Sequence, residues 1–437
     1  MKLKYGRTLL VGLAFFSICA FWQMYDGIVP LILRDTYGLK DGPSGFIMSL
    51  DNILALFLLP LFGAISDKKG RRLPFVLVGT LLAVVLMMVL PLLDNNYWAI
   101  DPSVSLLVFM AVLGLLLVVM GTYRSPAVAL MADITPKPLR SKGNAIINLM
   151  GAIGGLYTLQ MVKYAIVDGG NGERDNYFYL FLSVAALMVV AVAVLLLTIR
   201  ERKLVQEMKD INYGVPIEED QERAVDVDGK QKLSPAVRRS LILILSTIAL
   251  WFMGFNAVTT AFTKYATAMW HGGLDRAADC LFYATVAAVI SYLPIGFFSA
   301  KFGRKRMIQI GLVVAIICFV LAAIFGREFT AWLYPMFILI GFAQAAITVN
   351  TFPMVWEISR IGNVGKYTGY YYTCSMAAQI VTPTLSGYLI QWFGYNTLFP
   401  YAAIMVALAV IPICFAKHGD SKPESPKNKL EAFDVGD

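Results

Sequence analysis

The chain contains twelve long apolar segments, each close to the length needed to cross a lipid bilayer. About 20 apolar residues span the hydrocarbon core of a membrane, where the backbone must satisfy its own hydrogen bonds and therefore favours helices. Charged residues make up only 15% of the chain, against about 25% in soluble domains. The sequence thus predicts an all-α membrane protein with transmembrane helices near 8–33, 44–66, 73–93, 104–132, 144–166, 177–199, 238–264, 280–300, 306–325, 331–357, 367–391 and 397–416.

The distribution of positive charge predicts the orientation of these helices. Of the 37 Lys and Arg residues, 29 lie in the terminal segments and in alternate loops. Positive residues concentrate on the cytoplasmic side of membrane proteins, so we expect a multi-pass protein of the plasma membrane with both termini cytoplasmic. The net charge of +8 then reflects topology, and no nucleic-acid partner is expected. Lys2, Lys4 and Arg7 resemble the start of a signal peptide, but the following apolar segment is long enough to be a retained first helix.

A short repeat indicates that the chain consists of two similar halves. GAISDKKGRR (Gly63 to Arg72) and GFFSAKFGRK (Gly296 to Lys305) each lie between the second and third predicted helices of a half. Many transporters are built from such repeats. The polar segment between the halves lacks helical apolar periodicity, so we expect it to be flexible. We predict an N-terminal six-helix bundle over residues 1–199, a cytoplasmic linker over 200–237, a C-terminal six-helix bundle over 238–416 and a disordered cytoplasmic tail over 417–437.

The repeated loop follows the pattern GxxxDxxGRR. Its glycines permit close helix contacts, Asp67 can accept hydrogen bonds from a helix N-terminus, and Arg71 can pair across the bundle. The loop resembles the signature of the major facilitator superfamily, which implies the major facilitator fold. In that family the loop stabilises one conformation. The alternative is that its arginines only set the topology, and because Ala300 replaces the acid in the second copy, we expect that copy to be weaker. The resemblance assigns this latch role to Gly63, Asp67, Gly70, Arg71, Arg72, Gly303 and Arg304.

Three further segments narrow the resemblance. GFIMSLDNILALFLLPLFGAISD, RSPAVALMADITPKPLRSKGNAI and LWFMGFNAVTTAF are similar to bacterial relatives of the sucrose–proton symporters. The more distant glycoside–pentoside–hexuronide cation symporters share the general pattern. The RxPxxALxxD stretch from Arg124 to Asp133 is the most specific of these pieces. The resemblance implies a sugar, such as a disaccharide or another glycoside, taken up together with a cation.

Two acidic residues lie inside the predicted helices of the first half. Asp26 is about 18 residues into the first helix and Asp51 about 7 residues into the second, so both fall in the outer third of the bilayer. Acids within a membrane are costly and usually functional, and two neighbouring carboxylates can share one proton. We therefore predict Asp51 and Asp26 as proton-coupling residues. The alternative for Asp26 is a helix-end position near the interface, before Gly27 and Pro30.

The fourth predicted helix carries Arg124 and Asp133. A buried guanidinium needs partners, so Arg124 is expected to hold sugar hydroxyls, to pair with an acid or to join helices. Asp133 lies about 13 Å further inward, at the cytoplasmic mouth. It is a third candidate for proton coupling, with a bridge to Arg140 or to the Arg71 cluster as the alternative.

The second half offers fewer charged groups. Glu357 is the only acid within its predicted spans, and Lys264 lies at an outer end. Both positions are compatible with the membrane interface. His271 and His418 lie in predicted loops. Proton transfer would therefore have to use carboxylates.

Amide and aromatic side chains are distributed over both halves. Sugars are bound by amides and charged groups around an aromatic ring, and sites of this class lie near the midplane between the halves. Taken singly, each such residue more often joins neighbouring helices. The predicted substrate-binding residues are Arg124, Asn52, Gln23, Trp22, Asn148, Asn256, Gln344, Asn350 and Gln379, with Tyr157, Trp251 and Tyr371 nearby.

These features predict a secondary active transporter that imports a sugar with protons by alternating access. We expect a monomer in the lipid bilayer, with a proton as coupling ion and no cofactor or metal. The alternative is a proton-driven exporter of drugs or metabolites, and a nutrient receptor with a transporter fold comes third. Exporters typically have a Gly- and Pro-rich fifth helix, whereas this helix has Gly151, Gly154 and Gly155 without proline. No phosphate-binding glycine loop, metal cluster or nucleophile triad stands out, so an enzyme is not expected.

Overall fold

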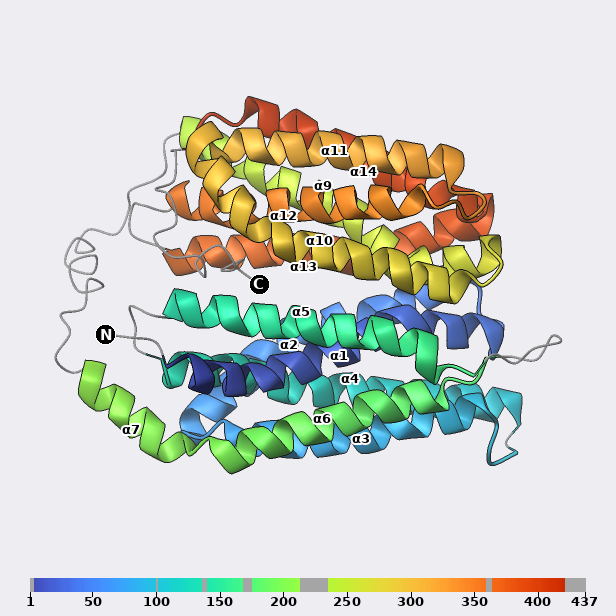
Figure 1. Cartoon of the computed structure of the whole chain (residues 1–437), viewed down its shortest axis with the longest axis horizontal. Coiled ribbons are helices and arrows are strands. Elements are labelled where there is room, and N and C mark those ends of the chain that lie inside the picture. The colour runs from blue at the N-terminus through green and yellow to red at the C-terminus, as the bar shows by residue number, and fades with distance from the viewer. Residues whose placement is uncertain are drawn as a thin grey trace.

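The computed structural model describes residues 4–99, 101–135, 140–167, 175–212, 235–358 and 364–420. In these ranges the chain is almost entirely helical (Figure 1). Each predicted segment corresponds to one long helix, which confirms the expected fold class of an all-α membrane protein. The long helices are α1 (Tyr5–Asp35), α2 (Asp41–Lys69), α3 (Leu73–Asp94), α4 (Pro102–Asp133), α5 (Arg140–Ala165), α6 (Phe178–Thr198), α9 (Pro235–Met269), α10 (Gly273–Phe302), α11 (Arg304–Phe325), α12 (Leu333–Ile358), α13 (Val364–Phe393) and α14 (Leu398–Phe415).

Ten of these helices are long and apolar enough to cross a membrane. The two that are less apolar are α5 and α13. Both pack against a helix of the opposite half, α5 against α10 and α13 against α2. A helix at the centre of a transmembrane bundle has little contact with lipid, so it can carry amides and charges. Their lower hydropathy therefore agrees with a central position in the bundle.

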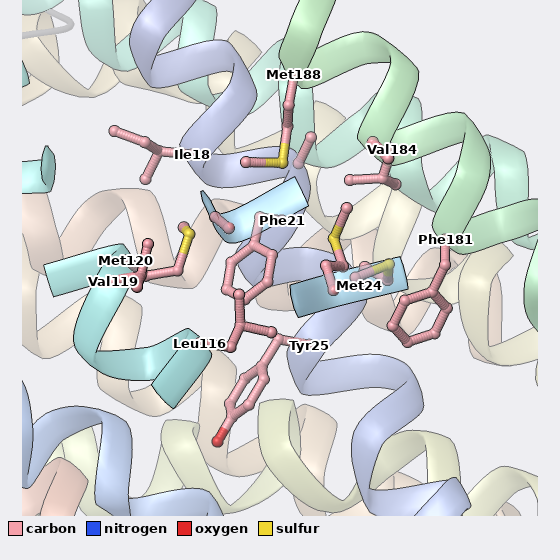
Figure 2. Packing of buried hydrophobic residues seen from close by; sticks show 14 of the residues in the cluster. Ile18, Phe21, Met24, Tyr25, Leu116, Val119, Met120, Phe181, Val184 and Met188 are labelled. Atoms are coloured by element: carbon pink, nitrogen blue, oxygen red, sulfur yellow. The ribbon is translucent and has the colours of Figure 1, made fainter. Parts of the chain in front are cut away.

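The first six long helices form one half and the last six form the other (Figure 1). Each half has its own apolar core. In the N-terminal half α1 packs against α5 and α6, and Figure 2 shows Phe21 and Met24 of α1 among side chains of α4 and α6. Many large apolar side chains are exposed, for example Leu107, Leu197 and Ile290. An apolar perimeter of this kind is suited to lipid contact.

The two halves meet along related pairs of helices. The α2 helix packs against α13, and α10 packs against α5. Because α10 occupies the place in its half that α2 occupies in the first, and α13 the place of α5, these contacts are equivalent. The first helices of the two halves, α1 and α9, also touch. The internal repeat thus produces an interface with approximate twofold symmetry.

The segment expected to be a flexible linker begins with a further helix, α7 (Glu201–Asn212). The expectation that this segment lacks helical periodicity is wrong for these residues. Leu204 and Val205 pack against the core of the N-terminal half, and their spacing with Met208 and Ile211 is helical. Glu201 is buried and accepts hydrogen bonds from the backbone N–H groups of Arg72 and Leu73. A carboxylate there caps the start of α3, where the helix dipole favours negative charge.

Most of the predicted linker and tail, residues 213–234 and 421–437, lies outside the described residues. The start of the tail is ordered against the C-terminal half. Asp420 accepts a hydrogen bond from the backbone N–H of Lys305, and His418 shares one with Ser240. The boundaries of the four predicted segments stay a prediction.

Candidate functional site

The acidic residues Asp26 and Asp51 lie on neighbouring helices, α1 and α2, inside the N-terminal half. They are close enough for their charges to interact. The amide Nδ2 of Asn52 donates a hydrogen bond of 2.8 Å to Asp51 Oδ1. All three side chains are half-buried. The structure therefore brings together three residues that the sequence singled out from two separate helices.

A cationic and an aromatic group complete this cluster. The charge of Arg124, on α4, interacts with that of Asp51. Its guanidinium carbon lies 6.0 Å from the centre of the Trp22 ring, within the range of a cation–π contact. One arginine thus interacts with Asp51, one of the two neighbouring carboxylates. We define the acid cluster as Trp22, Asp26, Asp51, Asn52 and Arg124.

Tyr25 belongs beside this cluster and was not predicted from the sequence. It is fully buried, and its hydroxyl lies within the electrostatic reach of both Asp26 and Asp51. Figure 2 shows its ring at the edge of the apolar core, with the hydroxyl directed away from the other labelled side chains. The available signal was its position three residues after Trp22, on the same face of the helix.

The predicted amide residues divide into two groups. Asn350 is buried and donates to the carbonyl of Ala346, and Gln379 donates to that of Ser375, each within its own helix. Gln23, Asn148, Asn256 and Gln344 are half-buried, and Gln23 faces Gly155 of α5. The Oδ1 atom of Asn256 is buried and has no hydrogen-bond partner among the described residues. Asn256 therefore offers an available acceptor in the second half.

The predicted aromatic residues are also separated by the fold. Trp251 is 2% exposed and stacks on Phe255 in the core of the C-terminal half. Tyr371 is buried against Phe352. Tyr157 on α5 is half-buried. Of the predicted aromatic residues, Trp22 is therefore the one that belongs to the acid cluster.

Asp133 lies away from the acid cluster, at the end of the bundle nearest the linker. Its Oδ2 accepts a hydrogen bond of 2.9 Å from Arg72 Nε. Arg72 is buried and also bonds to Ser66. Of the two alternatives for Asp133, the structure contains the bridge to the Arg71 cluster, which is formed by Arg72. The side chain of Arg140 lies outside the described residues.

The remaining residues of the repeated loop have different roles. Arg71 is exposed, and no acidic partner across the bundle is found for it among the described residues. A Cβ on Gly63 would lie 2.8 Å from Ser125 Oγ, so this glycine permits the approach of α2 to α4. Gly70 and Gly303 have φ angles of +62° and +95°, which glycine adopts without strain. In the second copy Arg304 donates to the carbonyl of Pro353. The side chains of Asp67 and Glu357 lie outside the described residues.

A network of polar contacts joins the two halves at the end opposite the linker. Lys264 of α9 is buried and lies 2.7 Å from Asp41 Oδ1 of α2. Tyr395 donates to the same oxygen. Arg34 of α1 donates to the carbonyl of Lys264 and to Thr267. An interfacial position for Lys264 is therefore wrong, because this residue is an internal contact between the halves. We call this group the outer network (Arg34, Asp41, Lys264, Thr267 and Tyr395).

A second ionic contact joins the halves, between Lys163 of α5 and Asp279 of α10. The sequence placed Asp279 just before a helix, whereas α10 begins at Gly273. Glu357 is therefore not the only acid in a long helix of the second half. The missed signal was the Gly272–Gly273 pair, a natural place for a helix to begin.

The outer contacts lie directly beside the acid cluster. Ser49 and Thr384, on α2 and α13, have their hydroxyl groups 3.5 Å apart, and Ser49 precedes Asp51 by two residues, about 3 Å along the helix. At the opposite end, the ion pairs Lys4–Glu207 and Arg72–Asp133 each lie within the N-terminal half. Among the described residues, these contacts join the halves at the end of the bundle opposite the linker.

Comparison with known proteins agrees with this architecture. Three solved structures cover nearly the whole chain: the inward open conformation of the xylose transporter XylE from E. coli (14% identity, TM-score 0.68, 96% of this chain and 98% of that chain), a D-xylose–proton symporter (14%, 0.66, 95% and 99%) and the nucleoside transporter NupG (16%, 0.67, 94% and 99%). At these identities the similarity concerns the fold.

A relative is also found among characterised sequences. The chain is 24% identical over 392 residues to Multidrug resistance protein 2 of Bacillus subtilis (strain 168), covering 88% of this chain and 89% of that protein. The family model described as the Major Facilitator Superfamily matches residues 11–277 and 277–434. Together with the two six-helix halves, this match shows that the chain is a transporter of the major facilitator superfamily.

Proposed function

We propose that this transporter imports a sugar, a disaccharide or another glycoside, together with protons. The observation that carries the proposal is the acid cluster, in which Asp26 lies near Asp51, and Asp51 interacts with an arginine beside an indole ring. With both acids ionised the cluster holds one excess negative charge. Movement of that charge through the low-dielectric centre of the bundle is costly. A proton on Asp51, shared with Asp26, would remove the cost when substrate is bound.

Support for a polyhydroxylated substrate comes from unpaired polar atoms on both halves. Trp22 Nε1 is a buried donor and Asn256 Oδ1 a buried acceptor, and neither has a partner among the described residues. Gly27 of α1 lies opposite Thr263 of α9, since a Cβ on Gly27 would be 4.0 Å from the Thr263 methyl group. Trp22 and Asn256 lie five and seven residues inward from these positions. They are therefore at similar depth, about 8 and 10 Å below that contact. A sugar hydroxyl can satisfy both a donor and an acceptor.

The sequence resemblance and the characterised relative favour different substrates. The Arg124–Asp133 stretch resembles sucrose–proton symporters, whereas the relative from Bacillus subtilis is named as a multidrug resistance protein. A proton-driven exporter of drugs or metabolites is therefore the second candidate, since an acid cluster of this kind serves antiport equally well. The substrate and the direction of transport must be measured together.

The test of import follows the external pH of lightly buffered, de-energised cells that contain the protein. Sucrose, maltose and other glycosides are added one at a time. We expect one sugar to raise the external pH, and Asp51→Asn to abolish the change. Glu328→Gln, in an exposed loop, removes a carboxylate far from the cluster and should have no effect. Absence of any pH change, or ethidium efflux that Asp51→Asn abolishes, would contradict sugar import and favour export.

The role of Asn256 is tested by transport kinetics. Loss of one hydrogen bond in a buried site costs about 1–3 kcal/mol, so Asn256→Ala should raise the KM for the imported sugar about tenfold. Expression and thermal unfolding of the variant should match those of the wild type. An unchanged KM would remove Asn256 from the substrate site.

A further inference from the structure

A groove runs along the periphery of the N-terminal half, over α2, α3 and α4. Its volume is about 640 Å³. The walls are mainly apolar and include Phe75, Val78 and Leu82. Val78 and Leu82 are 54% and 50% exposed. The groove opens beside α3, which lies on the side of this half farthest from the C-terminal half (Figure 1), so it faces the membrane and is separate from the acid cluster.

Two cations stand at one end of this groove. Lys69, in the last turn of α2, and Arg71, in the following loop, both line it and are exposed. The ammonium group of Lys69 lies 5.3 Å from the centre of the Phe75 ring. Among the described residues neither cation has an acidic partner. The loop that carries them lies at the end of the bundle that the positive-inside rule places in the cytoplasm.

The rest of the groove offers little to a polar ligand. Thr122 Oγ1, the hydroxyl in its wall, already donates a 2.6 Å hydrogen bond to the carbonyl of Val119. The charged residues of the lining are Lys69 and Arg71. A ligand that fits this surface must therefore be apolar along most of its length and negatively charged at its cytoplasmic end.

We propose that this groove binds an anionic diacyl phospholipid of the cytoplasmic leaflet. The phosphate lies between Lys69 and Arg71, where the guanidinium can donate two parallel hydrogen bonds to it. One acyl chain lies along Val78 and Leu82. Basic residues at the membrane surface attract anionic lipids, and the apolar walls add the burial of the chain. A neutral lipid would leave the cations unpaired, and a soluble phosphate would leave the apolar groove unused.

The proposal is tested on the purified full-length protein by native mass spectrometry. The protein is exposed to equal amounts of phosphatidylglycerol and phosphatidylcholine, and the retained lipid is counted. We expect the wild type to retain phosphatidylglycerol preferentially. In Lys69→Gln/Arg71→Gln the ratio of retained phosphatidylglycerol to phosphatidylcholine should fall about tenfold. Val78→Trp fills the groove and keeps both cations, and it should also reduce retention.

The matched control is Lys301→Gln/Arg306→Gln. It removes two exposed cations from the corresponding face of the other half, with the same change in net charge. We expect it to keep the wild-type preference. Equal loss in this control, or full retention in Val78→Trp, would show attraction to the general surface charge and overturn the proposal. Lipid retention is measured without a transported substrate, so its outcome does not depend on the proposed sugar import.

Discussion

The ammonium group of Lys264 illustrates the cost of a charge inside a helical bundle. Its side chain is 5% exposed and that of Asp41 is 16% exposed. Removal of one partner from a buried ion pair leaves a charge without compensation, which costs about 3–5 kcal/mol. Replacing both partners removes that penalty. Each member of the pair is therefore tolerated at this contact between the halves only while the other is present.

At this scale we predict that Lys264→Met and Asp41→Asn each lower the thermal unfolding temperature of the purified protein. The double variant should be more stable than the sum of the two single effects implies, because the pair is coupled. Lys4→Gln is the control, since the Lys4–Glu207 pair is 66% and 37% exposed and such pairs contribute about 0–1 kcal/mol. Strictly additive single effects would mean that Lys264 and Asp41 do not act as a pair.

The outer parts of α2 and α13 approach each other closely at two glycines. A Cβ on Gly45 would overlap the carbonyl oxygen of Pro383, and a Cβ on Gly387 would overlap that of Asp41. Backbone atoms cannot move aside as a flexible side chain can. These glycines therefore permit the closed outer contact beside Ser49 and Thr384, as small residues do between membrane helices.

At the scale of the element, Gly45→Ala is expected to force α2 and α13 apart and shift the protein toward a state that is open at the end opposite the linker. Double electron–electron resonance measures the distance distribution between spin labels that replace Tyr97 and Trp332. Both residues are exposed, one on each half, at the end opposite the linker. The native cysteines are replaced first. The distance should increase in Gly45→Ala and stay unchanged in Gly114→Ala, where a Cβ meets nothing within 4 Å. An unchanged distribution in Gly45→Ala would contradict the tight contact.

The whole molecule is held in one state by contacts that must break during transport. The outer network and the Lys163–Asp279 pair both join the halves at the end of the bundle opposite the linker. Alternating access requires the halves to rock about the central site. The same contacts must therefore separate when the site opens at that end.

At this scale we predict that a cross-link between Lys163→Cys and Asp279→Cys stops transport. A short thiol-reactive and reducible cross-linker should lower substrate flux to the level of cells without the protein, and a reducing agent should restore it. Each single cysteine variant treated with the same reagent is the control. Full flux in the cross-linked double variant would show that the two positions do not separate during the cycle.

The fold could be predicted from the sequence because lipid leaves few alternatives. Every long apolar segment must form a helix to satisfy its backbone, and the positive charges order those helices across the membrane. The repeat beginning at Gly63 and Gly296 indicated the two halves. The same reasoning indicated Asp26, Asp51 and Arg124, because charges within membrane helices are rare.

The pairing of residues was decided by the tertiary structure alone. Asp133 bonds to Arg72, 61 positions away, and Lys264 to Asp41, 223 positions away, and no local pattern encodes such contacts. Asn350 and Gln379 have the polarity of binding residues, yet their amides turn back onto their own helices. Sequence determines which groups cannot face lipid, because that cost depends on the residue itself. Only packing decides which partner satisfies each group, because that depends on where the other helices lie.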